Sequence, residues 1–225
     1  MVGDPRVIHD EVRRLTVAYP KLALPTLLGD LVEVQDLTFR LLEHGRVKPL
    51  QARELYLLAG ITSGMLAKAS HDLGNPSAAM MQARTAFVCA DNADHHAMRA
   101  WVRSLQSLIS YWAGRPAEAA DYADLGQAAA GSVRGTTSVW LACLSARAHA
   151  LLGDGEATRA AIQRAEDARA VLDLPIEQRN FGITSSAQRV HAALASGGRR
   201  ATGVAADLRE EIEAFTASPT SVLIR

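Results

Sequence analysis

The sequence predicts an all-α protein, an array of about ten helices in antiparallel pairs with no sheet. Hydrophobic residues make up 48% of the 225 residues and aromatic residues only 5%. Much of the apolar content is alanine, which favours close-packed helices over sheets. Glycine and proline divide the chain into segments of helical length, and none of these shows strict period-2 alternation. A glycine-centred pattern also recurs at Gly74, Gly114 and Gly153, which are 40 and 39 residues apart.

Prolines bound the first two predicted helices. We expect a helix over residues 4–18, because Asp4 is a typical N-cap, Pro5 suits the first helical position, and a proline at position 20 ends the run. A second helix is expected from Pro25 to Gly45, where apolar residues recur mostly at steps of 3 and 4. These apolar residues are Leu27, Leu28, Leu31, Val34, Leu37, Leu41 and Leu42.

The rest of the chain continues as helices separated by short turns. A third helix is expected over residues 49–73, and Gly74-Asn75-Pro76 stops it. Further helices are expected over residues 76–90, 97–113, 116–130, 137–152, 156–172, 185–195 and 202–217. We interpret residues 1–225 as a single domain. In it, residues 1–48 form N-terminal helices, residues 49–172 form core repeats, and residues 173–225 form a looser C-terminal repeat.

Charge and cysteine content exclude two classes of protein. The chain has 24 basic and 24 acidic residues, so it lacks the positive charge of a free-standing nucleic-acid binder. We therefore expect no direct DNA binding by this chain. Two cysteines, Cys89 and Cys143, are too few for a disulfide framework.

The sequence shows no membrane or export signal. Its longest uncharged stretch is 13 residues, 55–67, whereas a membrane-spanning helix needs about 20. The N-terminus is charged from residue 4 and lacks the apolar segment of a signal peptide. We therefore expect a cytoplasmic protein with both thiols reduced.

The recurring glycine pattern resembles the tetratricopeptide (TPR) helix–turn–helix. The three copies read LGNPSAAMMQARTA from residue 73, AGRPAEAADYADLG from residue 113 and LGDGEATRAAIQRAE from residue 152. The resemblance implies further small residues that let paired helices approach closely. These are Ala79 and Ala86, Ala119 and Gly126, and Thr158 and Ala165. The spacing exceeds the usual period of about 34 residues, so the predicted fold is a TPR-like helical repeat array, or α-solenoid, rather than a strict TPR.

A longer resemblance covers roughly residues 10–170. The runs RRLTVAYP (13–20), RELYLLAGITSGMLAKASHDLGNPSAAMMQARTAFVCAD (53–91) and RAWVRSLQSLISYWAGRPAEAADYADLG (99–126) carry it. They are similar to the C-terminal TPR-like region of XRE-type helix-turn-helix transcriptional regulators of high-GC Gram-positive bacteria. In that family a small DNA-binding domain precedes the helical array. The array is thought to sense a signal or to mediate assembly.

The N-terminal part of the chain departs from that family. The predicted helices over residues 4–18 and 25–44 are joined by YPKLALP, which holds two prolines and lacks the tight glycine-containing turn of a helix-turn-helix. We therefore expect the DNA-binding half to be absent. Either the sequence is a fragment, or the protein is a stand-alone paralogue.

The TPR resemblance also implies which side of the array binds a ligand. In such arrays the first helix of each pair lines a concave groove. The glycine register places on that side Ile61, Gly64, Lys68 and His71, then Trp101, Ser104, Leu108 and Tyr111, then Trp140, Cys143, Arg147 and Ala150, and, less regularly, Thr184, Ala187 and His191. We predict that the ligand-binding residues are Lys68, His71, Trp101, Tyr111, Trp140 and Arg147. Aromatic walls with cationic ends suit a peptide or an anionic, partly apolar small molecule.

Other roles stay open for these residues. Trp101 and Trp140 can instead pack between adjacent helices, since aromatic side chains dominate protein cores as readily as interfaces. Lys68 and Arg147 can be solvated or ion-paired surface residues.

We expect no metal or cofactor. Cys89, Asp91, Asp94, His95 and His96 lie within eight residues of one another, but they lack the paired spacing of zinc ligands. We interpret them as a polar turn between repeats, next to a buried cysteine.

No catalytic residues are predicted either. The sequence holds no G-x-S-x-G elbow, P-loop or H-E-x-x-H motif. The glycine-rich run GGRRATG at 197–203 follows no predicted strand, so it is interpreted as an inter-helix loop. The segment LREEIEAF at 208–215 is either a solvated face or a dimerisation helix with Leu208, Ile212 and Phe215 on one stripe.

These observations favour a regulatory sensor or interaction module that binds a signal molecule or a partner peptide in its groove. The alternative is a pure scaffold or dimerisation domain without a small ligand, and a homodimer is compatible with it. An enzyme that uses the groove as a pocket is less favoured, because function must be argued from a site and no motif supplies one.

Overall fold

The computed structural model describes residues 5–44, 47–131 and 136–166, which form eight α-helices and no strand. The helices are α1 (Pro5–Ala18), α2 (Leu24–His44), α3 (Pro49–Asp72), α4 (Pro76–Asn92), α5 (His96–Trp112), α6 (Pro116–Ala130), α7 (Thr136–Leu152) and α8 (Gly155–Glu166). All eight belong to one compact unit, Met1–Glu166. The all-α prediction is thus confirmed for the part of the chain that the structure describes.

The helix bounds predicted from the sequence agree closely with those of the structure. α6 has the predicted bounds, and the others begin and end within two residues of them, except that α8 is described only as far as Glu166. The two remaining predicted helices, over residues 185–195 and 202–217, lie outside the described residues, as does the predicted dimerisation stripe. No described helix combines the length and the apolar content that crossing a bilayer requires.

Four helices end in the same closed turn. The turn residues Gly74, Asp94, Gly114 and Gly153 have φ of 76°, 49°, 73° and 75°, the left-handed region that glycine enters without strain. Each of them donates its N–H to the carbonyl three residues earlier, at 3.0–3.2 Å. The next residue donates to the carbonyl five residues earlier, at 2.9–3.1 Å. This hydrogen-bond pair is the Schellman motif, which satisfies the last carbonyls of a helix.

The residue after the turn starts the next helix. The side chains of Asn75, His95 and Asp154 accept the backbone N–H groups of Ala78, Met98 and Ala157, at 3.0, 3.1 and 2.9 Å. These bonds satisfy N–H groups that have no partner inside the helix. One residue therefore closes the outgoing helix and caps the incoming one, so the two helices must run antiparallel and side by side.

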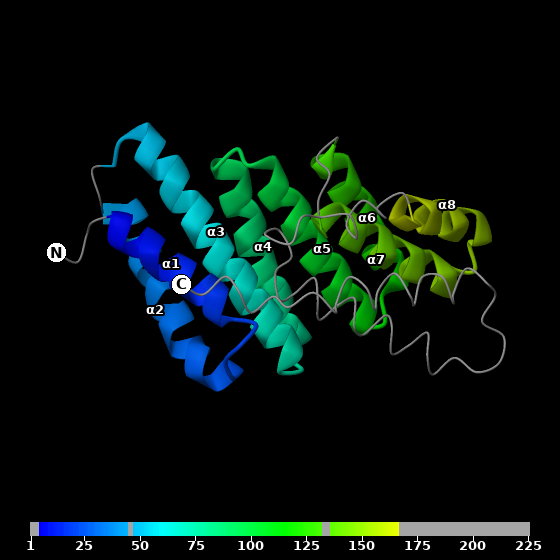
Figure 1. Ribbon diagram of the computed structural model, residues 1–225, viewed down its shortest axis with the longest axis horizontal. Coiled ribbons are helices and arrows are strands. Elements are labelled where there is room, and N and C mark those ends of the chain that lie inside the picture. The colour runs from blue at the N-terminus through cyan, green and yellow to red at the C-terminus, as the bar shows by residue number, and fades with distance from the viewer. Residues whose placement is uncertain (1–4, 45–46, 132–135, 167–225) are drawn as a thin grey trace, which may run out of the picture. The chain divides into compact units, whose positions relative to one another are not determined.

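The helices pack in chain order, and the odd-numbered ones also form a row. Each helix contacts the next, while α3 contacts α5 and α5 contacts α7 (Figure 1). Small residues allow this close packing: Ala79, Ala86 and Ala119 have 0% of their surface exposed. A methyl group added to Gly126 would come within 2.4 Å of Leu141 on α7. Three of the predicted small positions are thus buried alanines, and a fourth lies directly against the next helix.

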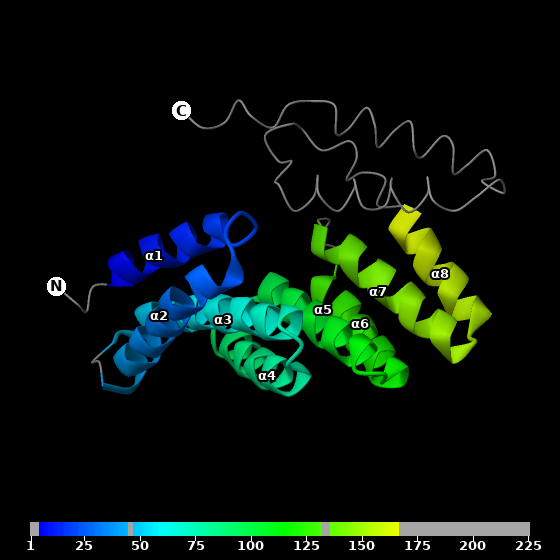
Figure 2. The ribbon, with the colours of Figure 1, turned by 90° about the horizontal axis from the view of Figure 1, so that it is seen from below.

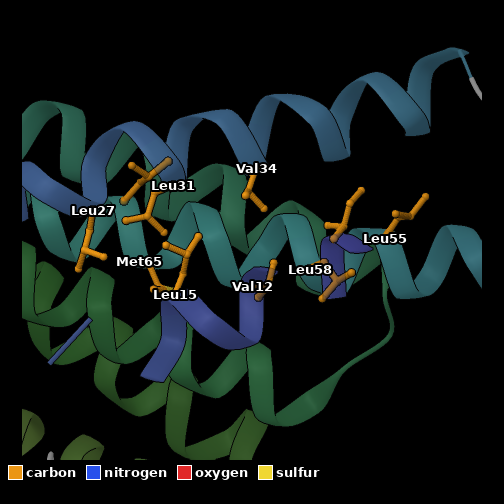
Figure 3. Packing of buried hydrophobic residues seen from close by; sticks show 10 residues of the cluster. Val12, Leu15, Leu27, Leu31, Val34, Leu55, Leu58 and Met65 are labelled. Atoms are coloured by element: carbon orange, nitrogen blue, oxygen red, sulfur yellow. The ribbon is translucent and has the colours of Figure 1, made fainter. Parts of the chain in front are cut away.

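The first two helices cover α3. Ile8, Val12 and Leu15 of α1 and Leu27 and Leu31 of α2 are at most 3% exposed. They form one cluster with Leu55, Leu58 and Met65 of α3 (Figure 3). Figure 2 shows α1 and α4 on opposite sides of α3, which explains why the middle of α3 is buried almost all round.

We expect Gly114→Ala to lower the free energy of unfolding by about 1–2 kcal/mol, because alanine is strained at positive φ. Nothing lies within 4 Å of an added methyl group there, so the loss reports backbone conformation alone. The matched control is Gly29→Ala in α2, which has equally open surroundings but no positive φ. It should stabilise the protein by up to about 1 kcal/mol. Urea unfolding followed by circular dichroism measures both, and effects of the same sign would contradict the prediction.

Candidate interaction surface

The six predicted ligand-binding residues lie on the row α3, α5 and α7. Lys68 and His71 are on α3, Trp101 and Tyr111 on α5, and Trp140 and Arg147 on α7. Arg147 is exposed, and the other five are half-buried. The row brings some of them into contact and separates others.

Trp101 fills the space left by a glycine. A methyl group built on Gly64 would come within 2.2 Å of the Trp101 ring, so the indole lies directly over the α3 backbone. Trp101 also packs against the cluster of Ala86, Met98 and Val102. Its contacts join α5 to α3 and α4, which is the packing role that the sequence left open for it.

Tyr111 and Arg147 are brought together, and Trp112 joins them. The Arg147 guanidinium carbon lies 4.2 Å from the centre of the Tyr111 ring and 5.7 Å from that of Trp112. The two rings meet edge to face, with centres 5.7 Å apart and an interplanar angle of 85°. A cation held over aromatic faces in this way keeps its N–H edges available for an anion.

The two contacts between neighbouring row helices follow one register. Trp101 lies 13 residues before Gly114, and its partner Gly64 lies 10 before Gly74. Arg147 lies six residues before Gly153, and its partner Tyr111 lies three before Gly114. In both pairs a residue contacts the position three residues later in the previous row helix. The contacts from α5 to α3 and from α7 to α5 therefore share the same shift.

The other predicted residues lie apart from this cluster. Trp140 packs on Leu108, Ala123 and Leu144. Lys68 forms an ion pair with Asp72 one turn later on α3, and both side chains are about one-third exposed. Burial and the nearby Lys68 ammonium lower the pKa of His71.

Two aromatic and cationic features were missed from the sequence. Trp112 is 65% exposed. It was not predicted as a ligand residue because the glycine register assigns Tyr111, and not the next residue, to the groove side. Arg103 lies 3.8 Å from the centre of the Phe87 ring and 5.4 Å from that of Tyr122. This stacking bridges α4 and α6 across α5. The sequence signal for Trp112 was its place at the end of a predicted helix, two residues before Gly114.

The predicted polar turn between α4 and α5 has mainly structural contacts. Arg99 pairs with Asp91 and Asp94 at 2.6 and 3.2 Å, and Arg53 of α3 reaches Asp94 at 3.3 Å. His95 caps α5, as described above. Cys89 is 2% exposed, and burial raises the pKa of its thiol to about 11. Within residues 5–44, 47–131 and 136–166, no group of three or more His, Cys, Asp or Glu side chains is placed to hold a metal ion.

Comparison with known proteins gives no relative. No family model, curated protein or solved structure matches the chain.

We expect Gly64→Ala and Trp101→Ala to be strongly non-additive. In the native background Gly64→Ala should cost about 1–3 kcal/mol, since the added methyl group overlaps the Trp101 ring. In the Trp101→Ala background the same change should be neutral or stabilising by up to about 1 kcal/mol, because the ring is gone and alanine favours the helix. Chemical unfolding of the four proteins measures the coupling.

The control cycle pairs Gly64→Ala with Trp112→Ala. Trp112 lies on α5, like Trp101, but its indole is 65% exposed. Those two changes should add. Additive effects in the Trp101 cycle as well would contradict the contact between Trp101 and Gly64.

A second prediction concerns pH. The pKa of His71 is lowered in the folded chain, so below its unfolded value of about 6.5 the unfolded state binds the proton first. Stability should therefore be fully present above about pH 6.5 and fall as the pH drops toward the folded pKa. His71→Gln removes this contribution, and denaturant midpoints from pH 7.5 to 5 measure it. An unchanged slope in His71→Gln would show that other groups carry the pH dependence.

Proposed function

We propose that this chain is a TPR-like interaction module whose row of odd-numbered helices binds an acidic, partly apolar segment of a partner protein. The observation that carries the proposal is the Arg147 guanidinium stacked on Tyr111 and Trp112. The proposed relationship to the helical half of XRE-type regulators rests on the sequence phrases alone.

The binding surface is a stripe along α7 and the end of α5, here called the Arg147 stripe: Tyr111, Trp112, Cys143, Arg147 and Leu151. Cys143, Arg147 and Leu151 follow one another at intervals of four residues, so they share one face of α7. All three are exposed, Leu151 by 61%. An indole beside the cation and an exposed leucine one turn further along α7 match a segment that alternates acidic and apolar residues.

Electrostatics favours an anionic partner. No carboxylate among the described residues forms an ion pair with Arg147, whereas Arg14, Arg53 and Arg99 are each paired with one or two. The guanidinium therefore retains donors that suit the bidentate recognition of a carboxylate. Arg147, which has no ion pair within the described part of the chain, lies next to exposed apolar groups, as do the central cations of many interfaces.

The observed hollows support a partner segment over an enclosed small molecule at this row. The hollow beside α1 and the one between α6, α7 and α8 are both open to solvent, and neither includes Trp101, Trp140 or Arg147. An open aromatic surface suits a protein partner. A pure scaffold role is the second candidate, and the packing of Trp101 on Gly64 favours it, since that contact uses a predicted ligand residue to hold two helices together.

We expect a peptide of alternating leucine and glutamate to shift backbone amide resonances at the C-terminal ends of α5 and α7. The matched peptide with glutamine for glutamate should bind about 10-fold more weakly, as the loss of a charge-assisted hydrogen bond predicts. Arg147→Gln should abolish the difference between the two peptides. NMR titration of the labelled full chain measures all three.

The control variant is Arg159→Gln on α8, which removes an exposed arginine away from the Arg147 stripe. It should leave both affinities unchanged. Equal binding of the two peptides, or an equal effect of Arg147→Gln and Arg159→Gln, would overturn the proposal.

A further inference from the structure

A polar cleft lies where α6, α7 and α8 meet. Its volume is about 550 Å³, within the range of about 300–1,000 Å³ that small-molecule sites occupy. Asp124 and Gln127 of α6, His149 of α7, Asp154 of the α7–α8 turn, and Glu156 and Arg164 of α8 line it. Groups from three helices and a turn therefore face one hollow that the predicted groove does not include.

Two buried atoms of this cleft have no hydrogen-bond partner among the residues that the structure describes. They are Gln127 Nε2, an amide donor, and His149 Nδ1. A buried polar atom without a partner costs about 1–3 kcal/mol, so native structures usually satisfy such atoms with water or a ligand. A ligand that brings an acceptor to Gln127 would remove this cost.

The imidazole of His149 lies between two carboxylates without a close bond to either. Its Nε2 is 3.5 Å from Asp124 Oδ2, and its Nδ1 is 3.9 Å from Asp154 Oδ2. The other oxygen of each carboxylate is already used. Asp124 Oδ1 accepts the Ser145 hydroxyl at 3.1 Å, and Asp154 Oδ1 accepts the Ala157 N–H at 2.9 Å. The Oδ2 atoms therefore remain as acceptors at the cleft.

The side chains that line the cleft include more acidic groups than arginines. Asp124, Asp154 and Glu156 are acidic, and Arg164 is the one arginine or lysine among the lining groups. A purely anionic ligand meets three carboxylates there, and a purely cationic one leaves Arg164 and the Gln127 amide without an acceptor. A ligand that carries both charges offers a donor to the carboxylates and an acceptor to Arg164 and Gln127.

We propose that this cleft binds a small zwitterion with the chemistry of a free amino acid. The ammonium group lies among the carboxylates and donates to one of the two Oδ2 atoms, that of Asp124 or that of Asp154. The carboxylate accepts from the Gln127 amide and the Arg164 guanidinium. Arg147 and His149 are two residues apart on α7, a rotation of about 200°, so this site and the Arg147 stripe lie on opposite sides of the helix and are independent.

The test is calorimetric titration of the full chain with the standard amino acids. At least one should bind saturably. For L-glutamine, taken as an example, the matched analogues are glutaramate, which lacks the ammonium, and 4-aminobutanamide, which lacks the carboxylate. Each analogue should bind about 10- to 100-fold more weakly than the parent amino acid, since each loses charge-assisted hydrogen bonds.

Two variants locate the site. Arg164→Leu and Gln127→Leu should each weaken the amino acid by about 10-fold or more and leave the binding of the analogue that lacks a carboxylate unchanged. Arg159→Leu, on the same helix but outside the cleft, is the control and should alter neither. Circular dichroism verifies that each variant is folded. The proposal is overturned if no amino acid binds, if an analogue binds as tightly as its parent, or if Arg159→Leu weakens binding as much as Arg164→Leu.

Discussion

At Gly74, Asp94, Gly114 and Gly153 the backbone enters the left-handed region and donates two hydrogen bonds back into the helix that it leaves. The chain then has a single residue in which to cap the next helix. This constraint leaves little freedom in the angle or the register between neighbours. Because the turns are alike, the contacts that they permit are repeated from one pair of helices to the next.

The contacts along the row of α3, α5 and α7 are also regular. Trp101 on Gly64 and Arg147 on Tyr111 show the same three-residue shift between neighbouring helices. The two contacts nevertheless have different consequences. A glycine lets the indole sink onto the α3 backbone, where it becomes part of the packing. Arg147 instead meets a tyrosine, and its guanidinium stays at the surface. The same shift therefore gives a packing contact between α3 and α5 and an exposed cation between α5 and α7.

The fold was predictable because its signals are local. Proline at the first turn, glycine at the closing turn and runs of apolar residues at helical spacing each act within a few residues, and the bounds of α6 were therefore obtained without error. Asp94 was harder to predict. It takes the left-handed turn between α4 and α5 in place of glycine, and its carboxylate also accepts from Arg53 and Arg99. The sequence shows a cluster of acids and histidines there, but it does not show that Asp94 takes the turn, that His95 caps α5, or that Arg53, 41 residues away, contacts Asp94.

The candidate sites were less predictable, because they depend on distances between helices. The glycine register placed Trp101 and Arg147 on the same row, as the structure has them. It could not predict which of these side chains would pack directly against a glycine. It also omitted Trp112, one position beyond the expected face. The polar cleft was invisible to it altogether, since Asp124, His149 and Arg164 are separated by 25 and 15 residues and only the packing of three helices brings them to one hollow.

The net charge of the chain is zero, but its arginines lie in two different kinds of surroundings. Arg14, Arg53 and Arg99 lie against carboxylates, so their charge is largely neutralised where it stands. Arg103 and Arg147 lie against aromatic rings instead, which attract a cation, and Arg103 also donates to Gln106 Oε1 at 2.9 Å. Burial lowers the pKa of Arg103 and restricts access to it, whereas Arg147 is exposed. Because an aromatic platform fixes the position of the guanidinium in advance, an anion that binds there need not order a flexible side chain, and this preorganisation is what distinguishes Arg147 from an ordinary surface arginine.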